Sequence, residues 1–230
     1  MWKIFYESFI TKKGYLDVFK GLGNTFLIAL LGLVIGIVVG VIIAAVKVYP
    51  SKSKLSKVLR AIADVYVTIL RGTPIVVQLL IMYYVILPTL GILLDNVVVA
   101  IIAFGLNSGA YVSEIIRSGI NSVDIGQMEA ARSLGFGYVR SMWYVVLPQA
   151  FKNIVPTLGN ELIVLIKETS VVSFIAVMDV TKAFSSIASA NYEFIVPYLV
   201  LASIYLIIVI GFTFAIRALE RRMKKSDRRS

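Results

Sequence analysis

Residues 21–46 read GLGNTFLIALLGLVIGIVVGVIIAAV and carry no charged side chain. The hydrocarbon core of a bilayer, about 30 Å thick, is crossed by about 20 helical residues, so this stretch is long enough to span a membrane. Gly32, Gly36 and Gly40 recur every four residues and share one helix face, where a neighbouring helix can approach closely. We expect a transmembrane helix from about Leu22 to Val46 that packs through these glycines.

The rest of the chain has the same apolar character. Of its 230 residues, 59% are hydrophobic and 16% are charged, and the mean hydropathy is +0.88, which is too apolar for a water-soluble domain. Further apolar runs lie at about 61–87, 97–116, 153–177 and 194–216. We predict an all-α, polytopic membrane protein with about five transmembrane helices.

Two residue types are missing altogether, because the chain has no cysteine and no histidine. This excludes disulfides, thiol nucleophiles and imidazole bases, together with the usual transition-metal ligands. The acids are scattered along the chain, which argues against a membrane-embedded enzyme. The net charge of +10 comes from bases that flank the apolar runs, a pattern typical of membrane topology and not of nucleic-acid binding.

The charge pattern divides the chain into three parts. Residues 1–20 alternate apolar and charged side chains, as an interfacial amphipathic helix does, and they lack the pattern of a signal peptide. The alternative for them is a frayed basic tail. Residues 21–217 form the predicted transmembrane domain, and residues 218–230 form a basic tail.

Lysine and arginine predict the orientation in the membrane. Segments 47–60, 117–152 and 217–230 carry 16 of these residues, whereas the two loops on the opposite side, 88–96 and 178–193, carry one. Cytoplasmic loops are enriched in Lys and Arg, so we expect a multi-pass protein of the cell (inner) membrane with its N-terminus outside and its C-terminus in the cytoplasm. The four lysines before Gly21 depart from this pattern.

One apolar run is interrupted by Arg71, Gly72, Thr73 and Pro74. Proline removes a helical hydrogen bond and glycine loosens the backbone, so backbone polar groups become free at membrane depth. Such backbone is tolerated only where it faces protein or a water-filled path. We therefore expect a helix break here that faces one or the other.

A polar interruption at 124–148 contains EAARSLGFGYVRSMWYVVLP, from Glu129 to Pro148. Its spacings resemble the EAA signature of the membrane subunits of ATP-binding-cassette (ABC) importers, which is matched at Glu129, Ala130, Ala131, Gly135, Val145, Leu147 and Pro148. Residues 71–88, RGTPIVVQLLIMYYVILP, resemble the corresponding segment of the polar amino-acid uptake family.

The resemblance implies a type I ABC importer permease fold. In that family the EAA segment forms two short cytoplasmic helices, bent at the glycine, that dock into an ATPase subunit. Carried over, this assigns ATPase coupling to Glu129, Ala130, Ala131, Arg132 and Gly135, with apolar anchors at Leu134, Phe136, Met142 and Trp143. The alternative is a linker that only returns the chain to the membrane.

The chain contains no G-x-x-x-x-G-K-[ST] loop or other phosphate cradle. No cofactor is therefore expected in it, and the resemblance places ATP and Mg on a partner ATPase. The implied partners are two copies of that ATPase, a second permease subunit in a homo- or heterodimer and an external solute-binding protein. The other expected partners are an amino-acid substrate and membrane lipid. No nucleic-acid partner is expected.

Ionisable groups inside transmembrane spans are costly, so they usually face the bundle interior or a cavity. Glu161 is the main candidate to bind a cationic side chain or an α-ammonium group, with Asn160 hydrogen-bonding nearby; alternatively, Glu161 pairs with another span. Further candidates could line a cavity or only pack between helices, namely Thr73, Gln78, Asn107, Ser108 and Tyr111. A third set is expected in gating, ligand closure or packing, namely Lys167, Glu168, Tyr83, Tyr84 and Tyr205.

We predict the permease subunit of an ATP-driven importer for polar, preferably basic, amino acids. The rival is an ion-coupled secondary carrier or channel. Such a carrier commonly shows an inverted repeat with paired broken helices, and five spans with one break argue against it.

Overall fold

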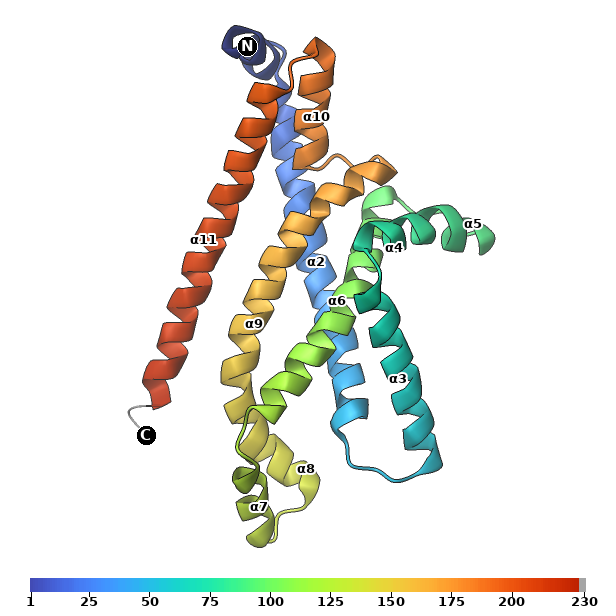
Figure 1. Cartoon of the computed structure of the whole chain (residues 1–230), viewed down its shortest axis with the longest axis vertical. Helices are drawn as coiled ribbons and strands as arrows, with labels where there is room; N and C mark the ends of the chain where they lie inside the picture. The colour runs from blue at the N-terminus through green and yellow to red at the C-terminus, as the bar shows by residue number, and fades with distance from the viewer. Residues whose placement is uncertain (228–230) are drawn as a thin grey trace.

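The computed structural model describes residues 1–227, and every regular element in them is helical. Five long helices alternate in direction between the two ends of an elongated bundle (Figure 1). One end carries the N-terminus and α10 (Val180–Asn191), and the other, which we call the hairpin end, carries α7 (Ile125–Ser133) and α8 (Tyr138–Ser141). The long helices are α2 (Gly14–Val48), α3 (Lys54–Gly72), α6 (Asn96–Asn121), α9 (Leu147–Glu168) and α11 (Ile195–Asp227).

Within residues 1–227, three helices are long and apolar enough to cross a membrane, namely α2, α6 and α11, and the bent pair that begins with α3 makes a fourth if its two parts are counted as one span. Helix α9 is more polar, because it contains Glu161, Lys167 and Glu168, and it contacts α2, α6 and α11. Contacts with three neighbours shield much of its surface. The all-α fold with about five long helices is confirmed.

Helix α2 packs on α6 through its glycine face. A methyl group added at Gly40 would lie 2.6 Å from Cγ1 of Val112 and 2.9 Å from the backbone nitrogen of Ser113. At Gly36 it would lie 2.7 Å from Cβ of Ser108. Such distances leave no room for a side chain, so the packing role expected from the glycine spacing is confirmed.

We expect Gly40→Ala to lower the thermal stability of the detergent-solubilised protein, because the new methyl group meets Val112 and backbone. Overpacking of this kind costs about 1–3 kcal/mol. The matched control is Gly23→Ala in the same helix, where nothing lies within 4 Å of the added methyl and alanine gains up to about 1 kcal/mol in helix propensity. Equal melting temperatures for the two variants would contradict the packing role.

The second predicted span breaks at the expected place. Helix α3 ends at Gly72, and the chain continues as α4 (Ile75–Ile81), the π-helix η2 (Met82–Ile86) and α5 (Leu87–Thr89). The two parts meet at 109°, and the second runs sideways out of the bundle (Figure 1). The sequence predicted a span from about Ala61 to Leu87 that is interrupted at residues 71–74. The interruption is found there, but only the part before it follows the bundle.

The N-terminal residues form α1 (Trp2–Tyr6) and the π-helix η1 (Glu7–Thr11) before α2 begins at Gly14. The first long helix thus starts earlier than the expected Leu22. Phe9 stacks on Phe184 of α10 with 6.3 Å between ring centres, and Asn191 donates to Ser8 over 2.6 Å. This segment is therefore packed against the bundle, which is incompatible with a frayed tail.

Two predicted loops and the predicted C-terminal tail contain more helix than the sequence indicated. Residues 178–193, expected as an outer loop, hold α10, whose first backbone N–H groups are capped by the buried Asp179 side chain. Only residues 49–53 separate α2 from α3. Helix α11 continues to Asp227, so the predicted tail from 218 extends that helix as far as the structure describes it, and residues 228–230 lie outside the described range.

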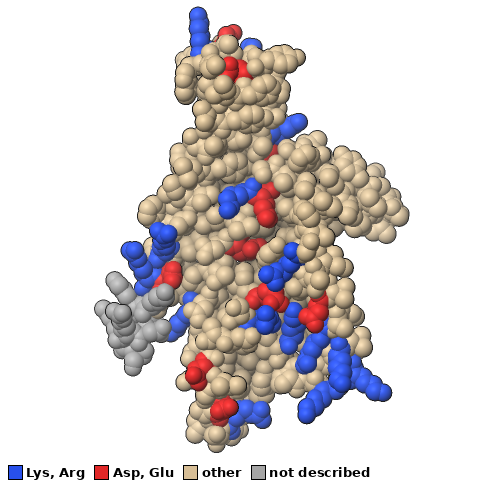
Figure 2. All heavy atoms as spheres, in the orientation of Figure 1, with Lys and Arg blue, Asp and Glu red and all other residues tan. Residues whose placement is uncertain are grey.

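Charged side chains are distributed unevenly over the bundle. On the face shown in Figure 2, many Lys and Arg side chains gather toward the hairpin end, whereas wide uncharged areas cover the rest of the molecule. A smaller group of acids and bases interrupts the uncharged area where the long helices lie side by side. That group marks the candidate site.

Candidate functional site

Glu161 is buried between α9 and α6. Its side chain is only 8% exposed, and its Oε1 accepts a hydrogen bond of 3.0 Å from Oγ of the buried Ser108. Ser108 also meets the glycine face of α2 at Gly36, so three helices converge here. Two of the predicted site residues are thus brought together, and the arrangement fits both a binding group and an interhelical pair.

Asn160 does not share this environment. It is exposed, because adjacent residues on a helix point in different directions and the Glu161 side of α9 faces α6. Of the other polar residues on α9, Lys167 is exposed and Glu168 is half-buried. The structure therefore places Glu161 alone, and not the Asn160–Glu161 pair, at the contact with α6.

The helix break is held by amide side chains. Nε2 of Gln78 donates to the backbone carbonyls of Leu70 and Thr73 over 2.8 and 3.0 Å, and lies 2.8 Å from Oγ1 of Thr73. Asn107 of α6 donates to the same Leu70 carbonyl over 3.1 Å and to Oε1 of Gln78 over 3.0 Å. Carbonyl groups freed by the break thus find partners, and these three predicted residues stabilise a bent backbone.

A cavity of about 480 Å³ opens between α3, α6 and α9. The Arg71 guanidinium lies in its wall, 5.2 Å from the ring centre of Tyr111, a cation–π distance. Thr157 of the wall precedes Glu161 by one turn of α9, and Tyr111 follows Ser108 by about one turn of α6. The buried Glu161–Ser108 pair therefore lies about one turn beyond the cavity, away from the hairpin end.

The tyrosines expected near a ligand are dispersed. Tyr83 and Tyr84 pack edge to face, with 4.8 Å between ring centres, on the arm that leaves the bundle. The Tyr205 hydroxyl lies 3.1 Å from Oγ1 of Thr181, near the N-terminal end. None of the three lines the 480 Å³ cavity, so Tyr111 is the aromatic residue that the structure brings to this site.

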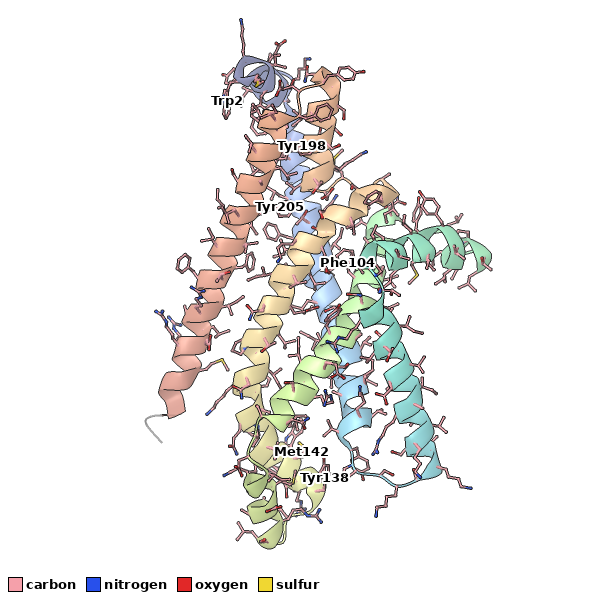
Figure 3. The ribbon with its side chains drawn as sticks, viewed as in Figure 1. Trp2, Phe104, Tyr138, Met142, Tyr198 and Tyr205 are labelled. Atoms are coloured by element: carbon pink, nitrogen blue, oxygen red, sulfur yellow. The ribbon has the colours of Figure 1, made fainter. Side chains whose placement is uncertain are left out.

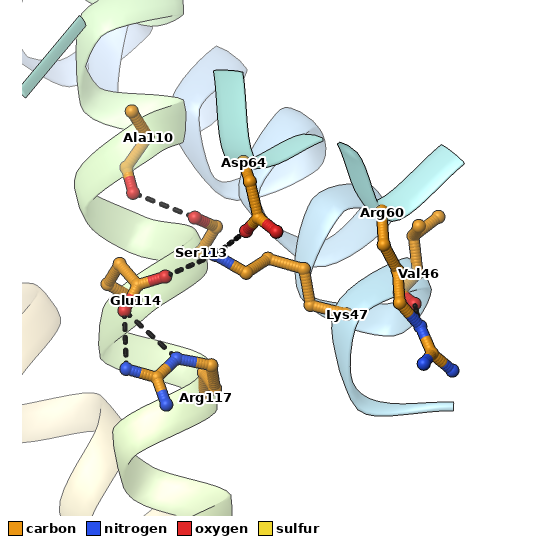
Figure 4. A network of polar contacts seen from close by, with 8 residues as sticks. All are labelled: Val46, Lys47, Arg60, Asp64, Ala110, Ser113, Glu114 and Arg117. Carbon is orange, nitrogen blue, oxygen red and sulfur yellow. Dashed lines mark hydrogen bonds and ion pairs between the residues drawn. The ribbon is translucent and has the colours of Figure 1, made fainter. Parts of the chain in front are cut away.

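An ion-pair network links α2, α3 and α6 beside the cavity (Figure 4). Nζ of Lys47 in α2 lies 2.9 Å from Oδ1 of Asp64 in α3 and 2.8 Å from Oε1 of Glu114 in α6. The other Glu114 oxygen pairs with Arg117 at 2.7 Å, and Glu114 and Arg117 also line the cavity. These charges connect three helices at one level. No group of three or more acids within residues 1–227 is close enough to hold a metal ion.

The coupling segment, residues 124–148, forms the tip of the hairpin end. Asp124 caps α7 through a 2.7 Å hydrogen bond from the Gly126 amide. The chain then reverses at Gly135, whose φ of +88° favours glycine, before α8 begins at Tyr138. The reversal expected at this glycine is confirmed. Glu129, Ala130 and Arg132 are exposed, whereas Ala131 is buried.

Apolar side chains on the coupling segment also reach solvent. Leu134 is 80% and Trp143 67% exposed. On the inner side, Tyr138 donates a 3.2 Å hydrogen bond to the Val48 carbonyl at the end of α2; Figure 3 shows Tyr138 and Met142 at this end of the bundle. Burial raises the pKa of Tyr138 above its ordinary value, so its hydroxyl keeps the proton that it donates.

Residue-level reasoning from the sequence missed Arg71, Asn153 and Thr157 as cavity-lining groups. Arg71 carried a signal, because it is a cation inside an apolar run next to a glycine and a proline. Asn153 and Thr157 lie one turn apart on α9 and are followed, another turn later, by Glu161. A polar stripe at this spacing could have indicated one face of the site.

Comparisons with known proteins agree with this architecture. The chain is 45% identical over 166 residues to an arginine transport system permease protein of Bacillus subtilis, covering 72% of this chain and 76% of that protein. It is 41% identical over 176 residues to an L-cystine transport system permease protein of the same organism, covering 75% of each.

Solved structures show the same fold. A chain of an amino acid ABC transporter, crystallised with histidines, is 39% identical and superposes with a TM-score of 0.84, covering 92% of this chain and 96% of that one. A chain of the MetNI methionine ABC transporter, at 20% identity and a TM-score of 0.68, supports the fold alone. The family described as "Binding-protein-dependent transport system inner membrane component" matches residues 32–225. The chain therefore belongs to this family of ABC importer permease subunits, as the resemblance in its sequence predicted.

Proposed function

We propose that this chain is the permease subunit of an ATP-driven importer for polar amino acids, with a preference for basic ones. The observation that carries the proposal is the exposed α7–α8 hairpin at the Lys- and Arg-rich end of the bundle. It presents charged and apolar side chains together, which a docking surface for another protein needs. A segment that only returns the chain to the membrane does not require Glu129 and Arg132 to be exposed on α7.

The assembly follows from the family. Two ATPase subunits dock at the coupling segments of two permease subunits, and a solute-binding protein delivers the substrate at the N-terminal end. The hairpin end faces the cytoplasm, where ATP is available, and the N-terminus lies outside. Movement of the docked hairpins is transmitted to the long helices and alternates access to the cavity.

Substrate recognition is assigned to two opposite charges. Arg71 has no carboxylate within 4.0 Å among the described residues, and a guanidinium binds a carboxylate through paired hydrogen bonds. Every α-amino acid carries such a group, including arginine and cystine, the substrates named for the two relatives. Glu161 lies one turn of α9 beyond Thr157 of the cavity wall. In this proposal its carboxylate binds a cationic side chain, which accounts for the preference for basic amino acids.

Arg71→Ala should raise the KM for arginine uptake at least about tenfold, since a hydrogen bond to a charged group contributes about 1.5–3 kcal/mol. Arg71→Lys keeps the charge but loses the paired hydrogen bonds, so its KM should lie between that of the wild-type protein and that of Arg71→Ala. Both variants are compared at equal amounts of folded protein in proteoliposomes. An unchanged KM for Arg71→Ala would remove Arg71 from the site.

ATP hydrolysis by the assembled complex tests the function as a whole. The chain is reconstituted with its ABC ATPase subunit and solute-binding protein, and phosphate release is measured. Amino-acid-loaded binding protein should raise the hydrolysis rate several-fold over the unloaded protein. A rate that is independent of the binding protein and of this chain would contradict the proposal.

A further inference from the structure

An apolar groove lies at the hairpin end, outside the substrate cavity and the exposed tip of the coupling segment. Its volume is about 270 Å³, and it is enclosed by the last turns of α2, by the end of α6 and by α8 with the π-helix η3 (Met142–Val146). We call it the Tyr49 groove. Its walls include Ala45, Tyr49, Ile120 and Trp143, and no charged side chain lines it.

A second depression adjoins the Tyr49 groove. It has a volume of about 420 Å³ and shares Ala45 and Tyr49 with the first. Its lining combines aliphatic side chains with the serine residues Ser51, Ser53 and Ser56. Together the two cavities lead from an apolar interior to a polar edge beside the α2–α3 connection, which is the shape of a site for an amphipathic molecule.

The polar edge is strongly cationic. Lys52, Lys54 and Lys57 are exposed, and none has a carboxylate within 4.0 Å among the described residues. Arg60 is already engaged, because its guanidinium binds the carbonyls of Tyr49 and Ser51 and thereby fixes the loop. These three like charges lie within six residues of sequence that contain no acid, so they repel one another and an anionic ligand would stabilise them.

We propose that the Tyr49 groove binds an acyl chain of an anionic phospholipid, whose phosphate group lies at Lys52, Lys54 and Lys57. A cavity of about 150 Å³ takes up benzene, so 270 Å³ has room for roughly ten chain carbons on that scale. Lysine clusters next to a transmembrane helix attract anionic headgroups. Tyr49 and Trp143 are 53% and 67% exposed, as aromatic residues at a membrane surface are.

A lipid fits this groove better than a protein partner. The groove continues along α2 to Val41, two turns before the helix ends, and so reaches into the apolar span. Of the residues expected to dock the ATPase, Glu129 to Phe136 are absent from its walls, whereas the expected apolar anchors Met142 and Trp143 line it and are reassigned by this proposal to the lipid. The lipid would touch α8 and the Tyr138–Val48 contact, where the coupling segment joins α2.

The positions of the tryptophans provide a direct test. The chain has two, Trp2 and Trp143, and Trp2 lies at the opposite end of the molecule (Figure 3). In a Trp2→Phe variant, all tryptophan fluorescence comes from Trp143. The protein is reconstituted into phosphatidylcholine vesicles that contain a minor fraction of lipid with brominated acyl chains, which quench tryptophan on contact.

Brominated phosphatidylglycerol should quench Trp143 at a concentration roughly fivefold lower than brominated phosphatidylcholine does. Lys52→Gln/Lys54→Gln/Lys57→Gln should abolish this preference, whereas the matched control Lys3→Gln/Lys12→Gln/Lys20→Gln should keep it. Added salt should weaken the preference without any substitution, which covers the case of a triple variant that fails to fold.

Equal quenching of Trp143 by the two lipids would overturn the proposal, and so would a preference that survives the loss of the three lysines. If the ATPase subunit shields Trp143 and no anionic preference exists, the groove belongs to a protein interface instead. None of these outcomes depends on transport, so the test is independent of the proposed substrate.

Discussion

Glu129→Lys should reduce ATP-dependent uptake at least about tenfold while the permease itself remains folded. Glu129 is exposed in α7, and no hydrogen bond or ion pair of its side chain is present within the described residues, so reversing its charge breaks no internal contact. At a docking surface the same change places a like charge against the partner. Losing one member of an interfacial charge pair typically costs about 2–5 kcal/mol, and about 1.4 kcal/mol corresponds to a factor of ten.

Two readouts separate docking from folding. Co-purification with the ATPase subunit should fall, or ATP hydrolysis should become independent of substrate, while the melting temperature of the isolated permease stays within a few degrees. Glu7→Lys makes the same charge change at an exposed position of the opposite end and should co-purify normally with the ATPase. Normal co-purification and full uptake by Glu129→Lys would refute the docking role.

Glu161→Gln should reduce uptake of arginine or lysine about tenfold or more, while uptake of glutamine changes less than about twofold. The amide has nearly the same shape as the carboxyl group and can still accept the hydrogen bond from Ser108 Oγ, so helix packing is kept. What disappears is the negative charge, and a hydrogen bond to a charged group contributes about 1.5–3 kcal/mol. The comparison is made by competition between substrates in proteoliposomes.

The control for Glu161 is its partner. Ser108→Ala removes the hydroxyl that holds the carboxylate but leaves the charge, so cationic and neutral substrates should be affected to a similar, smaller extent. If Glu161→Gln also affects both kinds of substrate equally, Glu161 only pairs α9 with α6, and it gives no support to the proposed preference for basic amino acids.

The fold follows from local sequence where a single residue type forces the backbone. Pro74 lacks an amide hydrogen, and α3 ends just before it; Gly135 adopts a φ of +88° where the chain reverses; the glycines of α2 permit its contact with α6. The direction taken after a break depends on partners remote in the sequence. The 109° bend is held by Asn107, 37 residues away from the Leu70 carbonyl that it binds.

Helix α10 was missed because residues 178–193 were assigned to an outer loop by their single lysine, between two long apolar runs. Its apolar residues nevertheless recur at Val180, Phe184 and Ile187 and are buried, a helical spacing that the sequence contained. Similarly, the basic residues after 217 were expected to end the last helix. Charges are incompatible with the hydrocarbon core but not with a helix, and α11 therefore continues through them to Asp227.

The candidate site was only partly predictable. Glu161 was identifiable because an acid within an apolar run must find polar surroundings, and Ser108 proved to be its partner. The exposure of Asn160 and the grouping of Arg71 with Tyr111 depend on the rotation of α9 and on the end of α3. Both are fixed by packing between helices and not by local sequence.

The central claim is that ATP, hydrolysed by a partner, drives transport through this chain. The most direct measurement is uptake of radiolabelled arginine into proteoliposomes that contain the permease and its ATPase, with the solute-binding protein outside and ATP inside. We predict accumulation that requires internal ATP and persists when ionophores dissipate the proton and sodium gradients. Accumulation by this chain alone, driven by an ion gradient without ATP or ATPase, would contradict the account.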